Sequence, residues 1–377
     1  MKLNNPKSKS FGLVIQGRIE SDLRTYNQKY NSNDAIQYNI RNYGKLFKKI
    51  VYCTWPSEKD NIKLNNADLQ NVDLLFVNDP GQPILYSGDT SDNRLRINYA
   101  SLKGVEHIKN QVDYIVKIRA DLKIDLSKCI NFFLKEIDRK KNILKDDFRG
   151  LVCGFEFWLN RPYALKDLLY IGTSIEINNF FLAQVEYKNQ RFAPLHNRDW
   201  PEGDSVRKYL YFNKKNLNQF KEENFFSITP KKLKWSNAVY YEDEFELWQF
   251  ALKNYFSALP KNIKTTCEFK GRKYGDFDTN FFEGDDHEIY IKAEENYLRL
   301  LKDISNETKS FMILKKSNFR FNPNFVKRKV ENLFKKKNII TRITKHILEL
   351  YIQYRKFLHL ISRRRLIKRI ILIFRNN

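Results

Sequence analysis

Residues 113–125 read DYIVKIRADLKID, an apolar run that passes directly into a cluster of charges. The first half is rich in β-branched and aromatic residues, as expected of a buried strand. Arg119, Asp121, Lys123 and Asp125 follow at once. Because a polar group is costly to bury without a partner, an acid at the end of a core strand needs either a partner or a ligand. The stretch therefore predicts a strand that ends at a functional position.

Three further apolar runs precede this strand. They are FGLVIQ at 11–16, KIVYCTW at 49–55 and VDLLFV at 72–77. Apolar residues recur at helical spacing between them, over 34–48 and 95–105. Strands that alternate with helices predict an α/β fold with a parallel, doubly wound sheet, whose ligands bind beyond the carboxyl ends of the strands.

The pattern is less regular after residue 150. GLVCGFEFWL at 150–159 is typical of a strand pair, and ALKDLLYIG at 164–172 of a short helix or a strand at a sheet edge. EGDDHE at 283–288 places acids beside His287, but consecutive side chains point in different directions. We therefore expect a solvated loop there and no metal site.

The composition predicts a folded protein of a reducing compartment. Of the 377 residues, 42% are hydrophobic and 15% aromatic, enough for a substantial core. The cysteines are scattered without a CxxC pair, which disfavours a disulfide framework and a zinc site. The first ten residues lack the apolar core of a signal peptide, and no stretch approaches the ~18 apolar residues of a membrane-spanning helix. We expect a cytoplasmic protein.

The net charge of +24 is concentrated at the C-terminal end. Residues 325–377 carry 16 Lys and Arg against two acids, a net charge of +14. Apolar residues also recur there at helical spacing, at Ile343, Ile347, Leu350, Tyr354, Phe357 and Ile361. This pattern predicts a basic amphipathic helix that binds an anionic membrane surface, at roughly 1 kcal/mol per basic residue near the lipid.

Two alternatives for the tail stay open. One is a helical hairpin that packs on its own domain. The other is nucleic-acid binding, because a pI near 9.6 is the electrostatic footprint of such proteins. The apolar stripe, which phosphate binding does not require, and the lack of a helix-turn-helix, zinc-finger or RNP-like motif make nucleic acid an unlikely partner.

Six short motifs occur in one order along the chain. They are FGLVIQGRI, VYCTWPSE, NDPG, NRLRINYASLKG, DYIVKIRAD and LYIGTSIEI. In this order they resemble the WavE-like family of lipopolysaccharide-synthesis proteins, over roughly residues 10 to 215. The chain departs from that family at Arg96-Ile97, where Arg-Gln is usual. Any polar role of that glutamine is therefore in doubt here.

The resemblance implies a glycosyltransferase of the GT-A type, with a Rossmann-like mixed sheet flanked by helices. Such an enzyme would move a sugar from a nucleotide-sugar to a bacterial surface polysaccharide, either lipopolysaccharide core or capsule. We expect a transferase domain at 1–322, with a nucleotide-binding half at 10–125 and an acceptor half at 126–322. The basic tail at 323–377 would hold it at the inner face of the inner membrane.

The donor would bind where the strands end. The expected donor-binding residues are Gln16, Gly17, Arg18, Thr54, Asp79, Asn93, Arg96 and Arg119. Glycine permits close backbone approach to a ligand, and guanidinium groups bind phosphate oxygens. Asp79 in NDPG has the alternative role of shaping the turn, and Asn93 and Arg96 that of a solvated helix face.

GT-A enzymes usually hold Mg²⁺ or Mn²⁺ on an Asp-x-Asp motif after the fourth strand, because these cations bind carboxylates and substrate phosphates. Here only Asp121 stands in the expected place, as the metal ligand and a catalytic residue. Asp125 is a weaker second ligand because Lys123 intervenes. The alternative is an ion pair between Arg119 and Asp121, so metal dependence stays open.

An inverting transferase also needs a general base for the acceptor hydroxyl. RDWPEGDSVRKYL offers Glu202 and Asp204, and we favour Glu202 over Asp204 and over a helix-capping role. A non-catalytic protein of glycan assembly is the remaining alternative, because the metal motif has a single acid.

Overall fold

The computed structural model describes residues 9–23, 28–65, 70–81, 94–157, 163, 165–187, 201–214, 217, 220, 238–273, 286–308 and 311–314. The tail at 323–377 and its predicted amphipathic helix lie outside the described residues, as do Asn93 and the expected domain boundary at 322.

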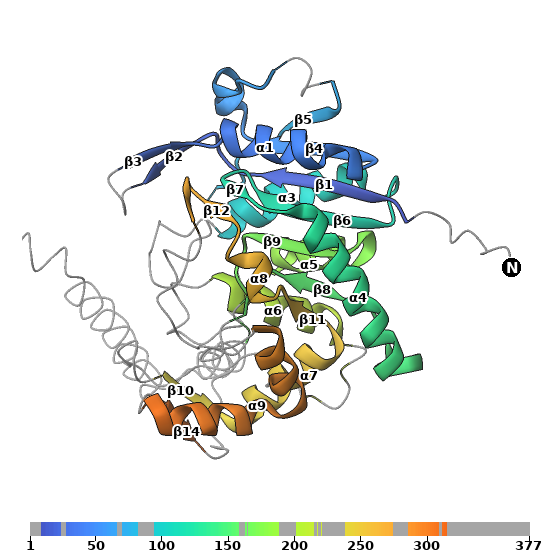
Figure 1. The fold of residues 1–377 in the computed structure, drawn as a ribbon, viewed down its shortest axis with the longest axis vertical. Helices are drawn as coiled ribbons and strands as arrows, with labels where there is room; N and C mark the ends of the chain where they lie inside the picture. Colours follow the sequence, from blue (N-terminus) through green and yellow to red (C-terminus); the bar gives the residue numbers. More distant parts are fainter. Residues whose placement is uncertain are drawn as a thin grey trace, which may run out of the picture.

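A seven-stranded mixed sheet forms the centre of the molecule (Figure 1). Its order is β5-β4-β1-β6-β9-β8-β11. The strands are β1 (Phe11–Gln16), β4 (Lys49–Thr54), β5 (Val72–Phe76), β6 (Tyr114–Arg119), β8 (Val152–Gly154), β9 (Leu169–Thr173) and β11 (Phe256–Ala258). Only β9 runs antiparallel to its neighbours in this sheet. The predicted α/β class, with a Rossmann-like mixed sheet flanked by helices, is confirmed.

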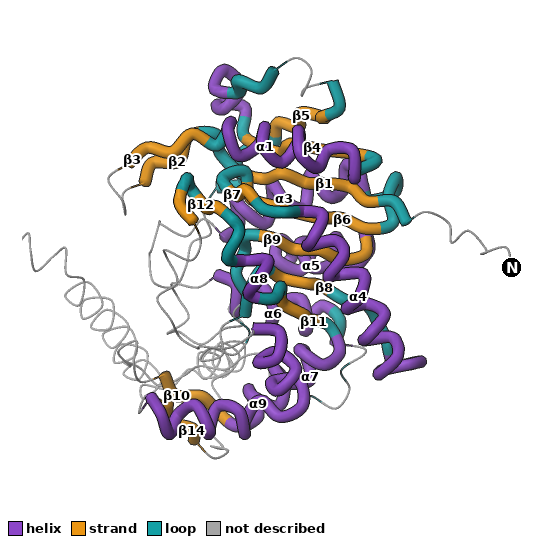
Figure 2. Tube along the Cα trace, in the orientation of Figure 1, coloured by secondary structure: helices purple, strands orange, loops and turns teal. Residues whose placement is uncertain are grey.

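Helices cover both faces of the sheet (Figure 2). They are α1 (Asn33–Tyr43), α3 (Arg94–Ile108), α4 (Leu126–Leu144), α5 (Ser174–Glu186), α6 (Pro201–Phe212), α7 (Glu242–Asn254), α8 (Lys261–Lys264) and α9 (Asp286–Thr308). Short 3-10 turns occupy Gly44–Leu46, Pro56–Asn61 and Lys145–Asp147. Helix α9 includes 286–288, so the solvated loop expected there is wrong: the chain is already helical from Asp286.

Alternation along the strands divides the core into two layers. Val14 of β1 packs in a layer with α3, α5, α6 and α7, whereas Leu13 and Ile15 pack in a layer with α1, α4 and α8. All three side chains have no solvent exposure. Because both faces are covered, the runs read as continuous hydrophobic stretches. Exposed functional groups are therefore confined to the ends of the strands.

Smaller strands surround the main sheet. They are β2 (Glu20–Leu23), β3 (Gln28–Asn31), β7 (Leu122–Lys123), β10 (Ala238–Tyr241), β12 (Glu268–Phe269), β13 (Arg272–Lys273) and β14 (Phe311–Leu314). Strands β13, β12 and β7 form one small sheet, so a segment near residue 270 lies beside the end of β6 (Figure 1).

Three sequence expectations need adjustment. The helix predicted over 34–48 ends at Tyr43 and continues as a 3-10 turn from Gly44. The predicted strand pair at 150–159 has one regular strand, β8, and a single bridge between Phe157 and Leu165. The segment at 164–172 leads into β9, which is an interior strand bonded on both sides and not an edge strand.

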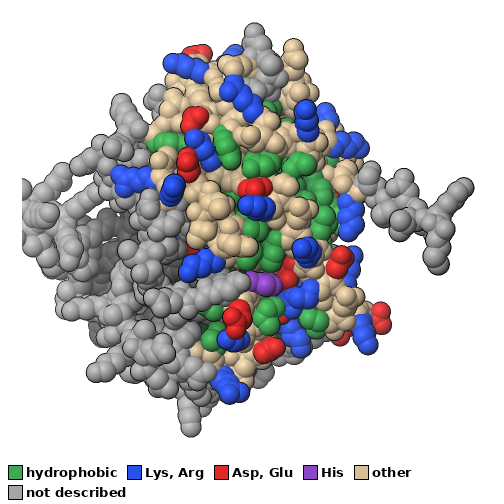
Figure 3. Space-filling model, viewed as in Figure 1, with side chains coloured by type: hydrophobic (Ala, Val, Ile, Leu, Met, Phe, Trp, Pro, Cys, Tyr) green, Lys and Arg blue, Asp and Glu red, His purple; other side chains and the backbone are tan. Residues whose placement is uncertain are grey.

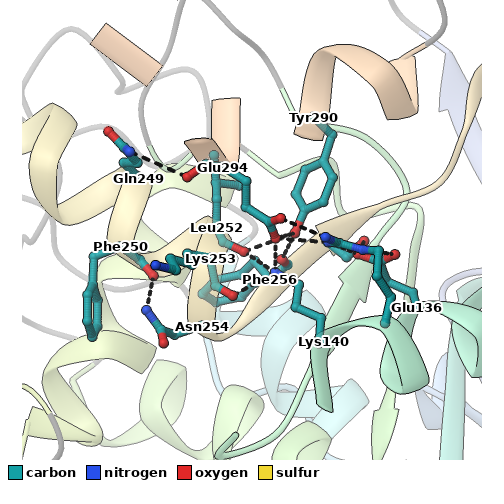
Figure 4. A network of polar contacts seen from close by, with 12 residues as sticks. Glu136, Lys140, Gln249, Phe250, Leu252, Lys253, Asn254, Phe256, Tyr290 and Glu294 are labelled. Atoms are coloured by element: carbon teal, nitrogen blue, oxygen red, sulfur yellow. Dashed lines mark hydrogen bonds and ion pairs between the residues drawn. The ribbon is translucent and has the colours of Figure 1, made fainter. Parts of the chain in front are cut away.

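An ionic network joins α4, α7 and α9 (Figure 4). The buried Lys140 ammonium donates to the carbonyl oxygens of Leu252 and Lys253 and to the Glu294 carboxylate. The two carbonyls belong to the last turn of α7, where helical carbonyls lack intrahelical partners. Lys140 thus caps α7 and ties it to α9.

Arg139 completes this network. It donates two hydrogen bonds to Glu136, at 2.9 and 2.6 Å, and two to Glu294, at 2.9 and 3.0 Å. The Tyr290 hydroxyl also donates to Glu294 or to nearby carbonyl oxygens. Burial lowers the pKa of Lys140 to about 8, although Glu294 opposes this shift.

Lys and Arg side chains are interspersed with Asp and Glu on the face seen in Figure 3. The described residues of this face form no single basic patch, so the excess charge does not gather there.

Candidate functional site

The carboxyl ends of β1 and β6 lie side by side. Gln16, the last residue of β1, is in register with Arg119, the last residue of β6, and on its other side with Cys53 of β4. Strands β4 and β5 continue the sheet on one side of β1, whereas β6 lies on the other. The connections thus change direction between β1 and β6, and ligands of open α/β sheets bind at such a reversal. The structure brings Gln16, Thr54 and Arg119 to this one edge.

Gly17 turns the chain away from the sheet immediately after β1. Its φ of +142° is a conformation that side chains rarely adopt, and an added Cβ would lie 3.2 Å from the Cβ of Ala120. The Ala120 amide donates to the Gln16 carbonyl at 2.8 Å, and the Tyr52 hydroxyl donates to the Gly17 carbonyl at 3.0 Å. The predicted glycine is therefore required by its backbone.

Arg18 extends from this turn toward solvent. Its side chain is 62% exposed, and its Nε donates to Glu58 at 2.7 Å. The buried Glu58 carboxylate also accepts from the Ile19 amide at 3.0 Å. Glu58 ends the motif VYCTWPSE, and its burial cannot be predicted from the sequence, because a lone acid in a polar segment gives no signal of burial.

Arg119 and Asp121 form a bidentate ion pair. The Arg119 Nε donates to Asp121 Oδ1 and the Nη2 to Oδ2, both at 2.9 Å. Nη1 donates to Asp167 at 3.1 Å. The Asp121 side chain is only 7% exposed, against 23% for Arg119. The ion-pair alternative of the sequence analysis is thus the arrangement observed, with Asp167 as a partner that the sequence did not reveal.

The charge of Asp121 is stabilised by this pairing. Burial alone would raise the pKa of the Asp121 carboxyl, but Arg119 outweighs burial and, with Lys270, holds this pKa below its ordinary value. Asp167 is held from a second side, because the buried Lys117 ammonium donates to its carbonyl oxygen at 2.9 Å. Both acids are therefore fixed in place around the Arg119 guanidinium.

The β12–β13 hairpin brings two more side chains to this point. The Arg119 guanidinium carbon lies 5.1 Å from the centre of the Phe269 ring, and the Lys270 ammonium lies 5.3 Å from the same centre. The Lys270 amide donates to the Asp121 carbonyl at 2.9 Å. Burial and the Arg119 charge lower the pKa of Lys270. Sequence reasoning missed Lys270, because the strands beside it have only two residues each and Gly271 is the single turn signal.

Asp79 and Arg96 meet after β5. Arg96 donates to both carboxylate oxygens of Asp79, at 2.8 and 2.7 Å. Asp79 also accepts from the Gly81 amide at 2.9 Å, which is the turn-shaping role left open for it. Both side chains are partly exposed. Thr54, in contrast, is buried at the end of β4.

Helices α5 and α6 run antiparallel. Gln184, late in α5, donates to the Ser205 carbonyl of early α6 at 2.9 Å. At the other end, the Tyr209 hydroxyl of late α6 donates to Glu176 in the first turn of α5. Helix α5 begins beside the start of β6, where the Ser174 amide donates to the Asp113 carbonyl.

The antiparallel packing of α5 and α6 determines where Glu202, the expected base, lies. Since α5 begins at the start of β6, the N-terminus of α6 lies at the opposite end of the helix pair. Glu202 is the second residue of α6, about 10 Å along the helix axis from Tyr209 at 1.5 Å per residue. The backbone of Glu202 is therefore displaced toward the edge that carries the carboxyl ends of the parallel strands. Its role as the base stays a prediction.

The residues at Asp121 fit a divalent cation poorly. Both Asp121 oxygens accept from Arg119, and Lys270 adds a second positive charge nearby. Among the described residues, no group of three His, Cys, Asp or Glu side chains is arranged to hold a metal ion. Magnesium or manganese ions can bind through one or two carboxylates and the substrate phosphates, but a cation at Asp121 would have to displace Arg119 from the carboxylate oxygens.

No family model and no curated protein matches the chain. The resemblance to WavE-like proteins therefore stays a prediction. Among solved structures, the chain is similar to 4-diphosphocytidyl-2C-methyl-D-erythritol synthase from Anaerococcus prevotii. The similarity has a TM-score of 0.30 and 11% identity, and it covers 54% of this chain and 83% of the other. None of the described helices combines the length and hydrophobicity needed to cross a membrane.

Proposed function

We propose that this chain is a glycosyltransferase that binds a nucleotide-sugar at the carboxyl ends of β1 and β6. The observation that carries the proposal is the meeting of Gln16 and Arg119 at the reversal of the sheet. Among the described residues, Asp121 and Asp167 engage three of the five N–H donors of Arg119. The other two donors can bind phosphate oxygens.

In the proposed reaction the acceptor hydroxyl oxygen forms a bond to the anomeric carbon of the sugar. The bond from that carbon to the diphosphate oxygen breaks, and negative charge passes to the leaving nucleoside diphosphate. Arg119 stabilises this charge, because a fixed cation near developing charge lowers the barrier. In an inverting course Glu202 takes the proton of the acceptor hydroxyl.

The remaining donor residues have distinct roles in this proposal. Gly17 allows the nucleotide to approach the backbone, and Arg18 lies exposed beside it. Asp79 and Arg96 form the far side of the site, after β5. The acceptor is proposed to be a growing bacterial surface polysaccharide, lipopolysaccharide core or capsule, reached by a basic tail bound at the inner face of the membrane.

A thermal-shift panel of nucleotide-sugars and free nucleotides, each with and without Mn²⁺, tests the donor site. A ligand that binds only the folded state raises the melting temperature with its concentration. We expect at least one nucleoside diphosphate and its sugar conjugate to do so. If no nucleotide shifts the melting temperature under any condition, the donor-site assignment is wrong.

Transfer itself is tested with Glu202→Gln. If Glu202 is the base, this variant keeps the donor-induced shift but loses about 10²- to 10⁴-fold in transfer rate, the usual contribution of general base catalysis. Asp204→Asn is the matched control and should retain transfer. Full transfer by the Glu202 variant contradicts its assignment as the base.

A further inference from the structure

Two cations at the end of β6 keep unused donor capacity. The Arg119 guanidinium has five N–H donors, of which three make hydrogen bonds to Asp121 and Asp167. The Lys270 ammonium has three N–H donors in all. Within the part of the chain that the structure describes, no hydrogen bond or ion pair engages the Lys270 ammonium. Both groups lie against the Phe269 ring. Five donors are therefore gathered in one small region of the sheet edge.

The backbone holds Lys270 in this position. Lys270 and Gly271 have φ values of +53° and +75° in the two-residue turn between β12 and β13. Positive φ at both central residues is the geometry that matches the twist of a tight hairpin. The Lys270 amide is bonded to the Asp121 carbonyl, and a Cβ on Gly271 would lie 3.1 Å from the Tyr30 ring. The hairpin is thus fixed to the same residue that orients Arg119.

A metal ion at Asp121 would compete with this arrangement. It would have to displace the Arg119 guanidinium from both carboxylate oxygens and would then lie close to two positive charges. Like charges a few ångströms apart repel strongly at the effective dielectric of a protein surface. The role usually given to the metal, which is to hold the diphosphate, can instead be filled by the two cations.

We propose that Arg119 and Lys270 bind the donor diphosphate directly, without a divalent metal ion, and that Asp121 and Asp167 are positioning residues for Arg119. This inference rests on the proposed function and deepens it. Asp121 and Asp167 hold the guanidinium plane before the donor arrives, so less conformational freedom is lost on binding. Lys270 contributes a compact charge that can follow either phosphate.

Calorimetric titration of the full chain with UDP, GDP, CDP and ADP, in Mn²⁺ or in EDTA, tests this inference. We expect the nucleotide that binds to do so with affinities equal within about twofold in the two buffers. Inorganic pyrophosphate is the second probe and should compete with that nucleotide. Binding that occurs only with the metal ion overturns the inference but leaves the proposed function standing. No binding in either buffer contradicts the proposed function, and the inference with it.

Lys270→Asn is the matched variant, because asparagine tolerates the left-handed backbone and removes the charge. The control is Lys273→Gln, an exposed lysine of the same hairpin. We expect Lys270→Asn to weaken nucleotide binding about tenfold, as loss of a charged hydrogen bond does, while the control changes affinity less than twofold. Equal affinities for the two variants would exclude Lys270 from the site. Unchanged melting temperatures would show that both variants are folded.

Discussion

Two ionic clusters in this molecule use the same residue types in different ways. In the α4–α7–α9 network, Lys140 uses its three donors, and Arg139 makes four hydrogen bonds to two glutamates. At the end of β6, Arg119 makes three and Lys270 makes none with the described residues. A cluster whose donors are used by the protein stabilises the fold, whereas a cluster with donors to spare is ready for an anion.

The largest expected effect is a loss of stability in the α4–α7–α9 network. Lys140→Met removes the buried ammonium but leaves Glu294 and two helix-end carbonyls short of a partner. Breaking a buried ion pair from one side costs about 3–5 kcal/mol. Urea unfolding should show that loss, while nucleotide affinity of the folded variant stays unchanged. Lys141→Met, at the exposed neighbouring position of α4, is the control and should cost under about 1 kcal/mol.

Arg119→Lys should have the opposite profile. The ammonium keeps the positive charge beside Asp121 but lacks the planar fork that binds two carboxylate oxygens and a phosphate together. We expect nucleotide affinity to fall at least tenfold, with a stability loss of about 1–2 kcal/mol. Titration and urea unfolding of the same sample measure both. If the variant loses stability but binds nucleotide normally, Arg119 stabilises the fold as Lys140 and Arg139 do and does not bind the nucleotide.

Acid should weaken the α4–α7–α9 network by protonating Glu294. Burial works to raise the pKa of Glu294, but Lys140 and Arg139 outweigh it and lower this pKa below its ordinary value of 4.5. A carboxyl with a lowered folded-state pKa stabilises the fold fully above its unfolded pKa, and the contribution is lost as pH falls further. The free energy of unfolding should therefore decrease below about pH 4.5, and less steeply in Glu294→Gln. Parallel profiles for the two proteins would contradict this role.

The smallest effect is expected where an ion pair is exposed. Arg96→Ala breaks the pair with Asp79, whose side chain is 45% exposed, so the stability change should stay under about 1 kcal/mol. If Arg96 belongs to the donor site, nucleotide affinity falls nonetheless. Asp79→Asn serves as the control for the turn, since it retains the acceptor oxygen for the Gly81 amide. If the unchanged protein, Arg96→Ala and Asp79→Asn bind the nucleotide with equal affinity, the donor site does not extend to the end of β5.

Much of the fold of residues 10–125 was predictable from local patterns. Strands β1, β4, β5 and β6 are short apolar runs that end at glycine, polar or turn residues. The sheet buries β1, β4 and β6 as those runs indicate, whereas the edge strand β5 is only partly buried. Gly17 and Arg119 were predicted at the sheet edge because they directly follow or end such runs. Local sequence was sufficient here, since each strand and its functional end are contiguous.

Other parts could not be predicted because they depend on distant partners. Asp167 and Lys270 meet Arg119 across 48 and about 150 residues of sequence, so no local pattern could link them to it. Lys117 and Lys140 are fully buried, although lysine is rarely so. Their burial depends on carbonyl oxygens supplied by other segments. The β2–β3 hairpin, whose strands read ESDL and QKYN, is mostly polar and also gave no strand signal.

The reversed direction of β9 has a consequence for how such an edge is assembled. A strand that runs against its neighbours begins where they finish, so the residues leading into β9 reach the place where β1 and β6 terminate. Asp167, two positions before β9, contacts Arg119 for that reason. Changes in the length of this incoming segment would re-aim the guanidinium while leaving every core strand untouched, which gives a simple route by which ligand preference could diverge on one scaffold.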